Sequence, residues 1–226
     1  MKYVYLAILC SYSIGMSDKS TTTGITNISI MTLNAGLTGW NIFGQQIDVV
    51  PDSIQRYSAI IEFLKSVDMD VVCLQEIFGE YRKKLISDLV DTFPYIYAHT
   101  NDLTGLCVLL KISANEVDHC TYDEQLGVDH VFKKGYTYIR INDFHISSTH
   151  ETAGGGVFGN TSKITSTVRD KHAMELDAYN RRLSTHRDTN IYITCGDFNC
   201  APEQLYANYL QLCEHGYDVG RVDPRV

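Results

Sequence analysis

The sequence predicts one layered domain of the α/β or α+β class. Apolar strand-like runs alternate with helix-like segments along the 226 residues, with no internal repeat and no interdomain linker. Hydrophobic residues make up 44% and charged residues 20%, a balance that supports a packed core and excludes a disordered chain. Several strands are too apolar to be half-exposed, so we expect two sheets packed face to face with helices outside. The pattern alone leaves a single Rossmann-like sheet open.

The first half of the chain shows this alternation clearly. Pro51 and Asp52 begin a helix, and apolar residues then recur at helical spacing as far as Val67. A second helix is expected at 81–91. Short apolar runs predict strands at 28–34, 70–76, 95–98 and 105–111.

The second half opens on an irregular, acidic stretch at 113–129. A hairpin follows, with strands at 137–141 and 143–149. The remaining expected elements are a glycine-rich loop at 151–163, a helix at 169–184, a strand at 191–195 and a last helix from Pro202 to about 212.

Residues 1–17 differ from the rest of the chain. An early lysine, a short apolar run and then small residues are typical of a secretory signal peptide, and we expect secretion. The run is too short and too interrupted for a comfortable membrane span. An uncleaved anchor and a buried N-terminal strand are the alternatives. Without Cys10, six cysteines remain of seven, and an even number permits disulfides in an oxidising compartment.

Polar residues follow four of the predicted strands. They are Asn34, Glu76, His150 and the pair Asp197 and Asn199. Polar groups placed just past apolar strands converge at one edge of a sheet, where sites form. Carboxylates with amide and imidazole groups suit a divalent cation together with a phosphate.

Four motifs in chain order resemble the endonuclease/exonuclease/phosphatase superfamily, which contains DNase I and the magnesium-dependent sphingomyelinases. They are LNAG, VVCLQEIF, STH and GDFN. The resemblance runs from about residue 28 to 212. Within the superfamily, TGLCVLLK, KKGYTYIRI and STHETA most resemble the secreted neutral sphingomyelinases.

The resemblance implies a four-layer α/β sandwich of the DNase I-like type, with two packed sheets flanked by helices. It implies that Glu76 is the principal ligand of Mg²⁺, with Mn²⁺ or Co²⁺ as alternative ions, and that Asn34 supports it directly or through water. It further implies that Asp197 orients or activates the attacking water, Asn199 holds a phosphate oxygen and His150 donates to the phosphate or the leaving oxygen.

One family feature is missing from the sequence. The family ends with a strand followed by an Asp-His pair, and no such pair follows Asn199. We therefore expect the domain over residues 25–226 to be C-terminally incomplete and to lack the segment that carries the catalytic histidine.

Three functions follow from the resemblance. The first is a secreted, metal-dependent phosphodiesterase that hydrolyses sphingomyelin or a related phospholipid headgroup at a membrane surface. The acidic net charge of -8 is compatible with it. Docking onto the membrane is expected to involve exposed aromatic or apolar residues, for which the candidates are Trp40, Phe43, Val157 and Phe158.

The second function is a DNase I-like nuclease with nucleic acid as its substrate. It requires basic groups that neutralise several phosphates, and the candidates are few and scattered, namely Lys133, Lys134, Arg140, Lys163 and Arg169. The third is a catalytically inactive or truncated member that keeps the fold. No pattern indicates an obligate protein partner.

Overall fold

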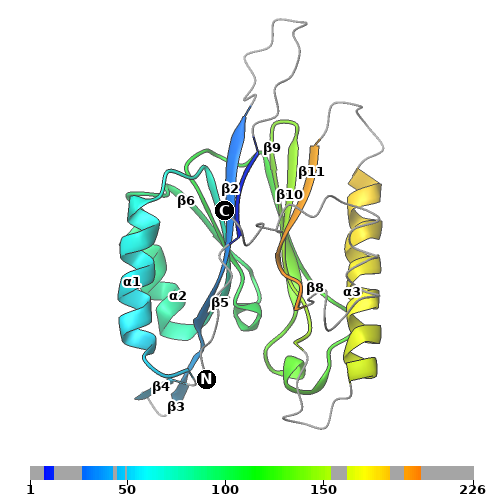
Figure 1. Ribbon diagram of the computed structural model, residues 1–226, viewed down its shortest axis with the longest axis horizontal. Helices are drawn as coiled ribbons and strands as arrows, with labels where there is room; N and C mark the ends of the chain where they lie inside the picture. Colours follow the sequence, from blue (N-terminus) through cyan, green and yellow to red (C-terminus); the bar gives the residue numbers. More distant parts are fainter. Residues whose placement is uncertain are drawn as a thin grey trace, which may run out of the picture.

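Two β-sheets pack face to face between helical layers in the computed structural model of the chain (Figure 1). This arrangement confirms the predicted pair of packed sheets and excludes the single Rossmann-like sheet. The residues that the structure describes are 8–12, 27–42, 45–48, 50–153, 162–183 and 191–199.

The first sheet has five strands in the order β1-β2-β5-β7-β6. Their bounds are β1 (Ile8–Tyr12), β2 (Ile28–Leu37), β5 (Val71–Ile77), β6 (Tyr95–Ala98) and β7 (Cys107–Leu110). β2 and β5 run parallel, whereas β1, β7 and β6 pair antiparallel with their neighbours. β1 lies within the expected signal peptide, which stays a prediction.

The second sheet has the order β11-β10-β9-β8. Its strands are β8 (Glu116–Thr121), β9 (Gly135–Ile141), β10 (Phe144–His150) and β11 (Ile191–Asp197). The hairpin of β9 and β10 confirms the predicted one. β10 and β11 run parallel, as β2 and β5 do in the first sheet.

Two strand regions differ from the prediction. β8 lies in the acidic stretch at 113–129, for which we expected irregular structure. It is an edge strand, where charged side chains such as Glu116 and Asp118 face solvent and discourage pairing with another chain. The short hairpin of β3 (Gly39–Ile42) and β4 (Gln45–Asp48) has no apolar pattern that would have predicted it.

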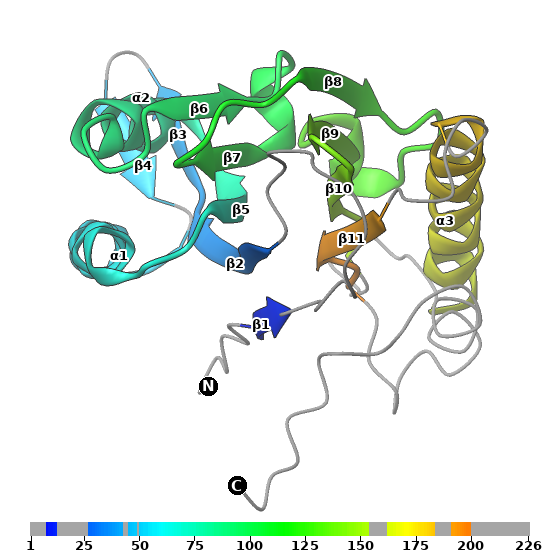
Figure 2. The same cartoon turned by 90° about the horizontal axis from the view of Figure 1, so that it is seen from above.

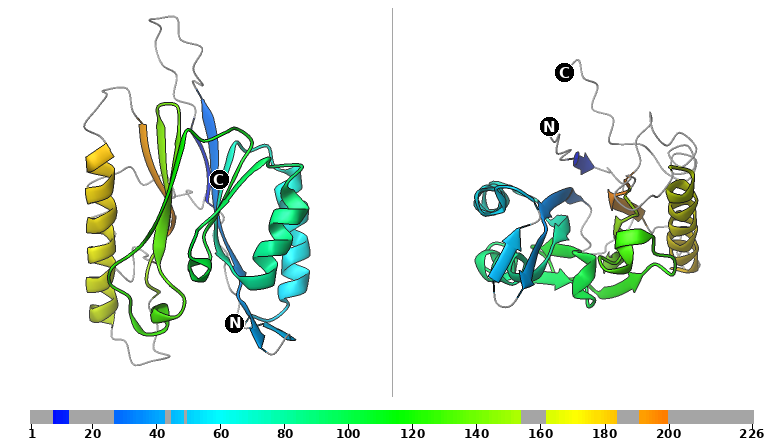
Figure 3. Two further views of the ribbon diagram at one scale, coloured as in Figure 1. Left: turned by 180° about the vertical axis from the view of Figure 1, so that it is seen from behind. Right: turned by 90° about the horizontal axis from the view of Figure 1, so that it is seen from below.

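Helices cover the outer faces of both sheets (Figures 2 and 3). α1 (Ser53–Ser66) and α2 (Gly79–Leu89) lie against the first sheet, and α3 (Ser162–Leu183) covers the second. α3 begins at Ser162 rather than at the predicted 169, because its first turns are mostly polar and carry little helical apolar pattern. In the described part of the chain, no helix is both long and apolar enough to cross a membrane.

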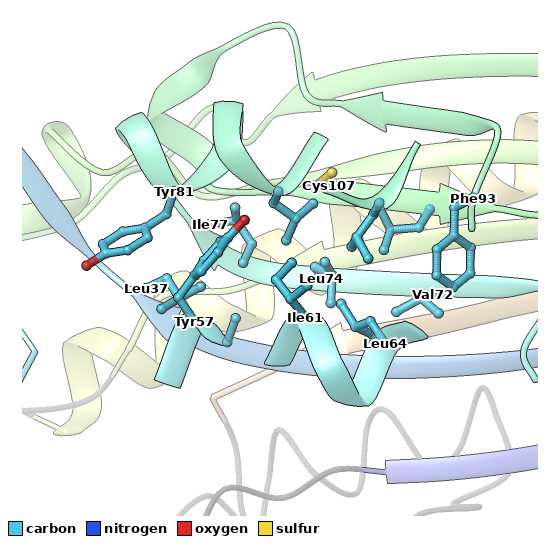
Figure 4. Close-up of a cluster of buried hydrophobic side chains, with 14 of the residues drawn as sticks. Leu37, Tyr57, Ile61, Leu64, Val72, Leu74, Ile77, Tyr81, Phe93 and Cys107 are labelled. Atoms are coloured by element: carbon cyan, nitrogen blue, oxygen red, sulfur yellow. The ribbon is translucent and has the colours of Figure 1, made fainter. Parts of the chain in front are cut away.

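Three apolar clusters hold the layers together. Aliphatic side chains fill the space between the sheets, among them Ile30, Val71 and Ile146. A second cluster packs α1 and α2 onto the first sheet (Figure 4). Beneath α3 the contacts are largely aromatic, with Tyr122 and Tyr136 tilted against each other at a centroid distance of 5.6 Å.

Several expectations fall outside the described residues. They concern the predicted last helix after Pro202, most of the loop at 151–163, and the docking candidates Phe43, Val157 and Phe158. Trp40 lies in β3, but its side chain is outside the described part as well. Among the cysteines whose side chains the structure describes, Cys73, Cys107, Cys120 and Cys195 are free thiols.

His172 of α3 is a buried neutral base in the aromatic cluster. Its ring stacks on Tyr122 at a centroid distance of 4.0 Å, and its Nε2 donates to the backbone oxygen of Glu124 at 2.8 Å. Burial lowers the pKa of His172 to about 4. At pH values below about 6.5, His172 is therefore protonated in the unfolded chain but stays neutral in the folded chain. The free energy of unfolding falls as the pH approaches 4.

We expect His172→Phe to flatten this acid dependence. In urea unfolding at pH 7 and pH 4.5, the wild type should lose about 2 kcal/mol more stability between the two pH values than the variant. His130→Gln, which changes an exposed histidine, is the matched control and should behave like the wild type. Equal losses in the wild type and His172→Phe would contradict a buried neutral His172.

Candidate active site

The ends of the two parallel strand pairs place the predicted site residues at one edge of the sandwich. In the first sheet Asn34 pairs with Gln75, and Glu76 follows directly. In the second, His150 pairs with Asp197. Carboxyl ends of parallel strands meet at the same sheet edge, and here it is the lower end in Figure 1, where β2 leads into β3.

Asn34 holds the two carboxylates in place. Its Nδ2 donates to Glu76 Oε1 at 3.1 Å and to Asp197 Oδ2 at 2.8 Å. Its Oδ1 accepts from the backbone of Gly36 at 3.0 Å, which fixes the amide. In this arrangement Asn34 supports Glu76 by a hydrogen bond, and its expected support of the metal ion stays a prediction.

Glu76, His150 and Asp197 offer a donor set for a metal ion. One ligand atom from each lies within 4.8 Å of the others. The Nε2 atom of His150 is 3.9 Å from Glu76 Oε1 and 3.8 Å from Asp197 Oδ2. Two carboxylates held this close repel each other unless a cation or hydrogen-bond donors lie between them. The chemistry of the donors therefore fits a hard divalent ion such as Mg²⁺.

Lys134 is the site residue that the sequence reasoning missed in this role. Its Nζ lies 2.8 Å from His150 Nε2 and 3.9 Å from Asp129 Oδ1, and all three side chains are buried. We named Lys134 only among scattered basic groups. Lys134 directly precedes β9, and β9 begins beside the end of its neighbour β10. This position in the sequence could have indicated that Lys134 lies close to His150.

The electrostatics of this cluster favour an uncharged imidazole. Burial and the ammonium group of Lys134 lower the pKa of His150 well below its usual value. Burial also lowers the pKa of Lys134, whereas the nearby carboxylates of Asp129, Glu76 and Asp197 act in the opposite direction.

Asn199 lies on the same edge but its side chain is tied to the neighbouring strand end. Its Nδ2 donates to the backbone oxygen of Glu151 at 2.7 Å, and its backbone N–H donates to Asp197 Oδ1 at 2.9 Å. Asn199 and Glu76 both adopt left-handed backbone conformations, with φ of 49° and 58°. Such conformations in residues other than glycine cluster at functional sites.

Gln75 fixes the two sheets behind the site. It is buried, and its Nε2 donates to Thr32 Oγ1 at 3.1 Å and reaches Ser148 Oγ of the other sheet at 3.4 Å. Gln75 therefore cross-links the strand that carries Glu76 to the strand that carries His150.

Comparison with family models matches residues 38–213 to the endonuclease/exonuclease/phosphatase family. No match is found among curated protein sequences.

Solved structures share the fold. The structure of SmcL superimposes with a TM-score of 0.68 at 20% identity, covering 81% of this chain and 68% of that one. Sphingomyelinase C from Streptomyces griseocarneus gives 0.64 at 19% identity, with 84% and 69% covered. A beta toxin variant from Staphylococcus aureus with bound magnesium ions gives 0.66 at 17% identity, with 80% and 68% covered. At these identities the matches show a common DNase I-like sandwich.

Proposed function

The chain belongs to the endonuclease/exonuclease/phosphatase family, and we propose that it is a magnesium-dependent phosphodiesterase acting on a phospholipid headgroup. The observation that carries the proposal is the convergence of Glu76, Asp197 and His150 within 4.8 Å at one sheet edge, with Asn34 bridging the carboxylates. A catalyst of phosphodiester hydrolysis needs a cation site, a base for water and donors for the phosphate, and we propose that residues at this edge take these roles.

Glu76 would be the principal ligand of the ion, with Asn34 fixing the carboxylates of both Glu76 and Asp197. A magnesium ion bound there would draw electron density from a phosphoryl oxygen and offset the negative charge that develops during attack. The bound magnesium of the beta toxin variant supports this choice of ion.

Side chains of the protein activate the water, bind the phosphate and stabilise the leaving oxygen. Asp197 orients the attacking water and accepts its proton, because it is a partly exposed carboxylate at the end of β11 and shares Asn34 Nδ2 with the proposed metal ligand Glu76. The water oxygen bonds to phosphorus as the bond to the leaving oxygen breaks, and the leaving oxygen takes up a proton from solvent, which gives a phosphorylated headgroup and a lipid alcohol. Asn199 holds a phosphate oxygen. His150 and Lys134 donate hydrogen bonds to the phosphate or to the leaving oxygen.

His150→Ala should slow turnover about 10²- to 10³-fold, the effect of removing one donor to the developing charge. Magnesium affinity should change far less than with a carboxylate variant. His145→Ala is the matched control, because His145 is also buried in β10 but bonds to Tyr138 rather than to a site residue. Equal losses in the two variants would assign His150 to packing alone.

Sphingomyelin is the substrate that we propose first. Sphingomyelinase C has the same fold, the middle of the sequence resembles the secreted sphingomyelinases, and the net charge of -8 disfavours a polyanion such as DNA. We further propose that residues 1–17 direct secretion. The test is hydrolysis of sphingomyelin vesicles and of duplex DNA by the same preparation with Mg²⁺. Release of the phosphorylated headgroup supports the proposal. Salt-sensitive cleavage of DNA without hydrolysis of sphingomyelin would favour the nuclease function instead.

A further inference from the structure

The turn η1 (Asp102–Thr104) lies at the site edge of the first sheet. It is part of the connection from β6 to β7, and Cys107 at the start of β7 pairs with Leu74 near the end of β5. The connection therefore lies beside the end of β5, which carries Glu76. The backbone N–H of Ile77 donates to Gly105 at 3.0 Å and holds the connection there.

The turn η2 (Gly127–His130) lies at the same edge of the second sheet. It belongs to the connection from β8 to β9, and Gly135 at the start of β9 pairs with both Thr121 and His150. Both turns thus flank the proposed site, one from each sheet.

An aromatic pair links the end of β5 to the connection from β8 to β9. The rings of Phe78 and Phe132 meet edge to face with centroids 5.2 Å apart. The ring of Phe78 also lies against Gly105, where a Cβ would come within 2.5 Å of it. The turns are therefore packed against a common support.

Three aliphatic side chains project from this supported edge. Leu103 of η1 is 46% exposed, Val128 of η2 is 43% exposed and Val131, just after η2, is 50% exposed. Surface turns are usually polar, and apolar groups gathered beside a site mark an interaction surface. We call these three residues the apolar rim.

The charges near the rim indicate the kind of surface. The exposed carboxylate of Asp102 beside Leu103 is balanced by an ion pair with Arg82 at 3.0 Å, and the whole chain carries a net charge of -8. Anionic lipid would repel such a protein, so apolar insertion rather than charge attraction must supply the binding. A zwitterionic phospholipid layer fits both properties.

We propose that the apolar rim inserts into the interfacial layer of a zwitterionic phospholipid membrane and so brings headgroups to the site. This inference rests on the proposed function for its substrate. The rim differs from the docking candidates that the sequence suggested, because its residues are aliphatic and are spread over two connections.

The test is a triple variant, L103S/V128S/V131S, compared with V90S/M174S. Val90, directly after α2, and Met174 on α3 are the control because they are exposed apolar residues away from the site edge. Partition onto phosphatidylcholine–sphingomyelin vesicles should fall at least about tenfold in the triple variant, from the loss of three apolar side chains. The control should partition like the wild type, and neither adding anionic lipid nor lowering salt should strengthen binding.

Hydrolysis separates this inference from the proposed function. The triple variant should lose vesicle turnover while keeping its rate on the water-soluble diester bis(p-nitrophenyl) phosphate. Unchanged vesicle partition of the triple variant, or an equal loss of partition in the control, would contradict the proposal that the apolar rim docks on the membrane. Loss of DNA binding instead of vesicle binding would also overturn it. If the wild type hydrolyses neither substrate, the proposed function fails, and the partition measurement still decides whether the rim docks.

Discussion

Glu76→Gln is expected to abolish turnover and magnesium binding together. The substitution keeps the shape of the side chain and removes one of the two carboxylate charges that Asn34 holds in place. A hard divalent ion loses most of its affinity when its principal carboxylate ligand becomes neutral. We expect the rate to fall by roughly 10³-fold or more, the scale of losing a metal's contribution to charge stabilisation.

Two measurements check this prediction. Calorimetric titration of Mg²⁺ reports binding without reference to activity, and vesicle hydrolysis reports turnover. Glu116→Gln is the control, because Glu116 is an exposed carboxylate that pairs with Arg140 on the surface of the second sheet. If Glu76→Gln binds magnesium as tightly as the wild type, Glu76 is not a ligand of the metal ion.

Asp197→Asn is expected to separate binding from turnover. The amide keeps an oxygen that can accept from the backbone of Asn199, so the strand end should stay in place. It cannot take a proton from water, and it loses the charge that holds Asn34 Nδ2 at 2.8 Å. We expect turnover to fall by about 10³-fold or more, within the range for loss of a general base.

Magnesium affinity should remain within about tenfold of the wild type, because Glu76 and the oxygen of the new amide are still present. Asp177→Asn, which removes a surface partner of Arg181, is the control and should change neither property. If Asp197→Asn abolishes magnesium binding as completely as Glu76→Gln does, Asp197 is chiefly a ligand and the base lies elsewhere.

Much of the fold was predictable because its central strands are short, continuous apolar runs, a pattern typical of buried strands. β5 and β10 have buried residues on both faces, and the alternation of strands with helices requires layers. β8 was not predictable in this way, since an exposed edge strand has no continuous apolar pattern.

The site was predictable as far as residues directly follow strands. Asn34, Glu76, His150 and Asp197 stand at strand ends, and the structure brings them together. Lys134 was missed because it precedes a strand, and only the antiparallel pairing of β9 with β10 carries it to the same edge. The internal bonding of Asn199 and the cross-link by Gln75 depend on tertiary contacts that no local pattern encodes.

The most direct test of the central claim is the rate of sphingomyelin hydrolysis after chelation and after return of magnesium, in the wild type and in Glu76→Gln. A metal site built on Glu76 predicts no hydrolysis after chelation, a saturable recovery with Mg²⁺ in the wild type and no recovery in the variant. Hydrolysis that persists after chelation, or that magnesium restores equally in both proteins, would contradict the account.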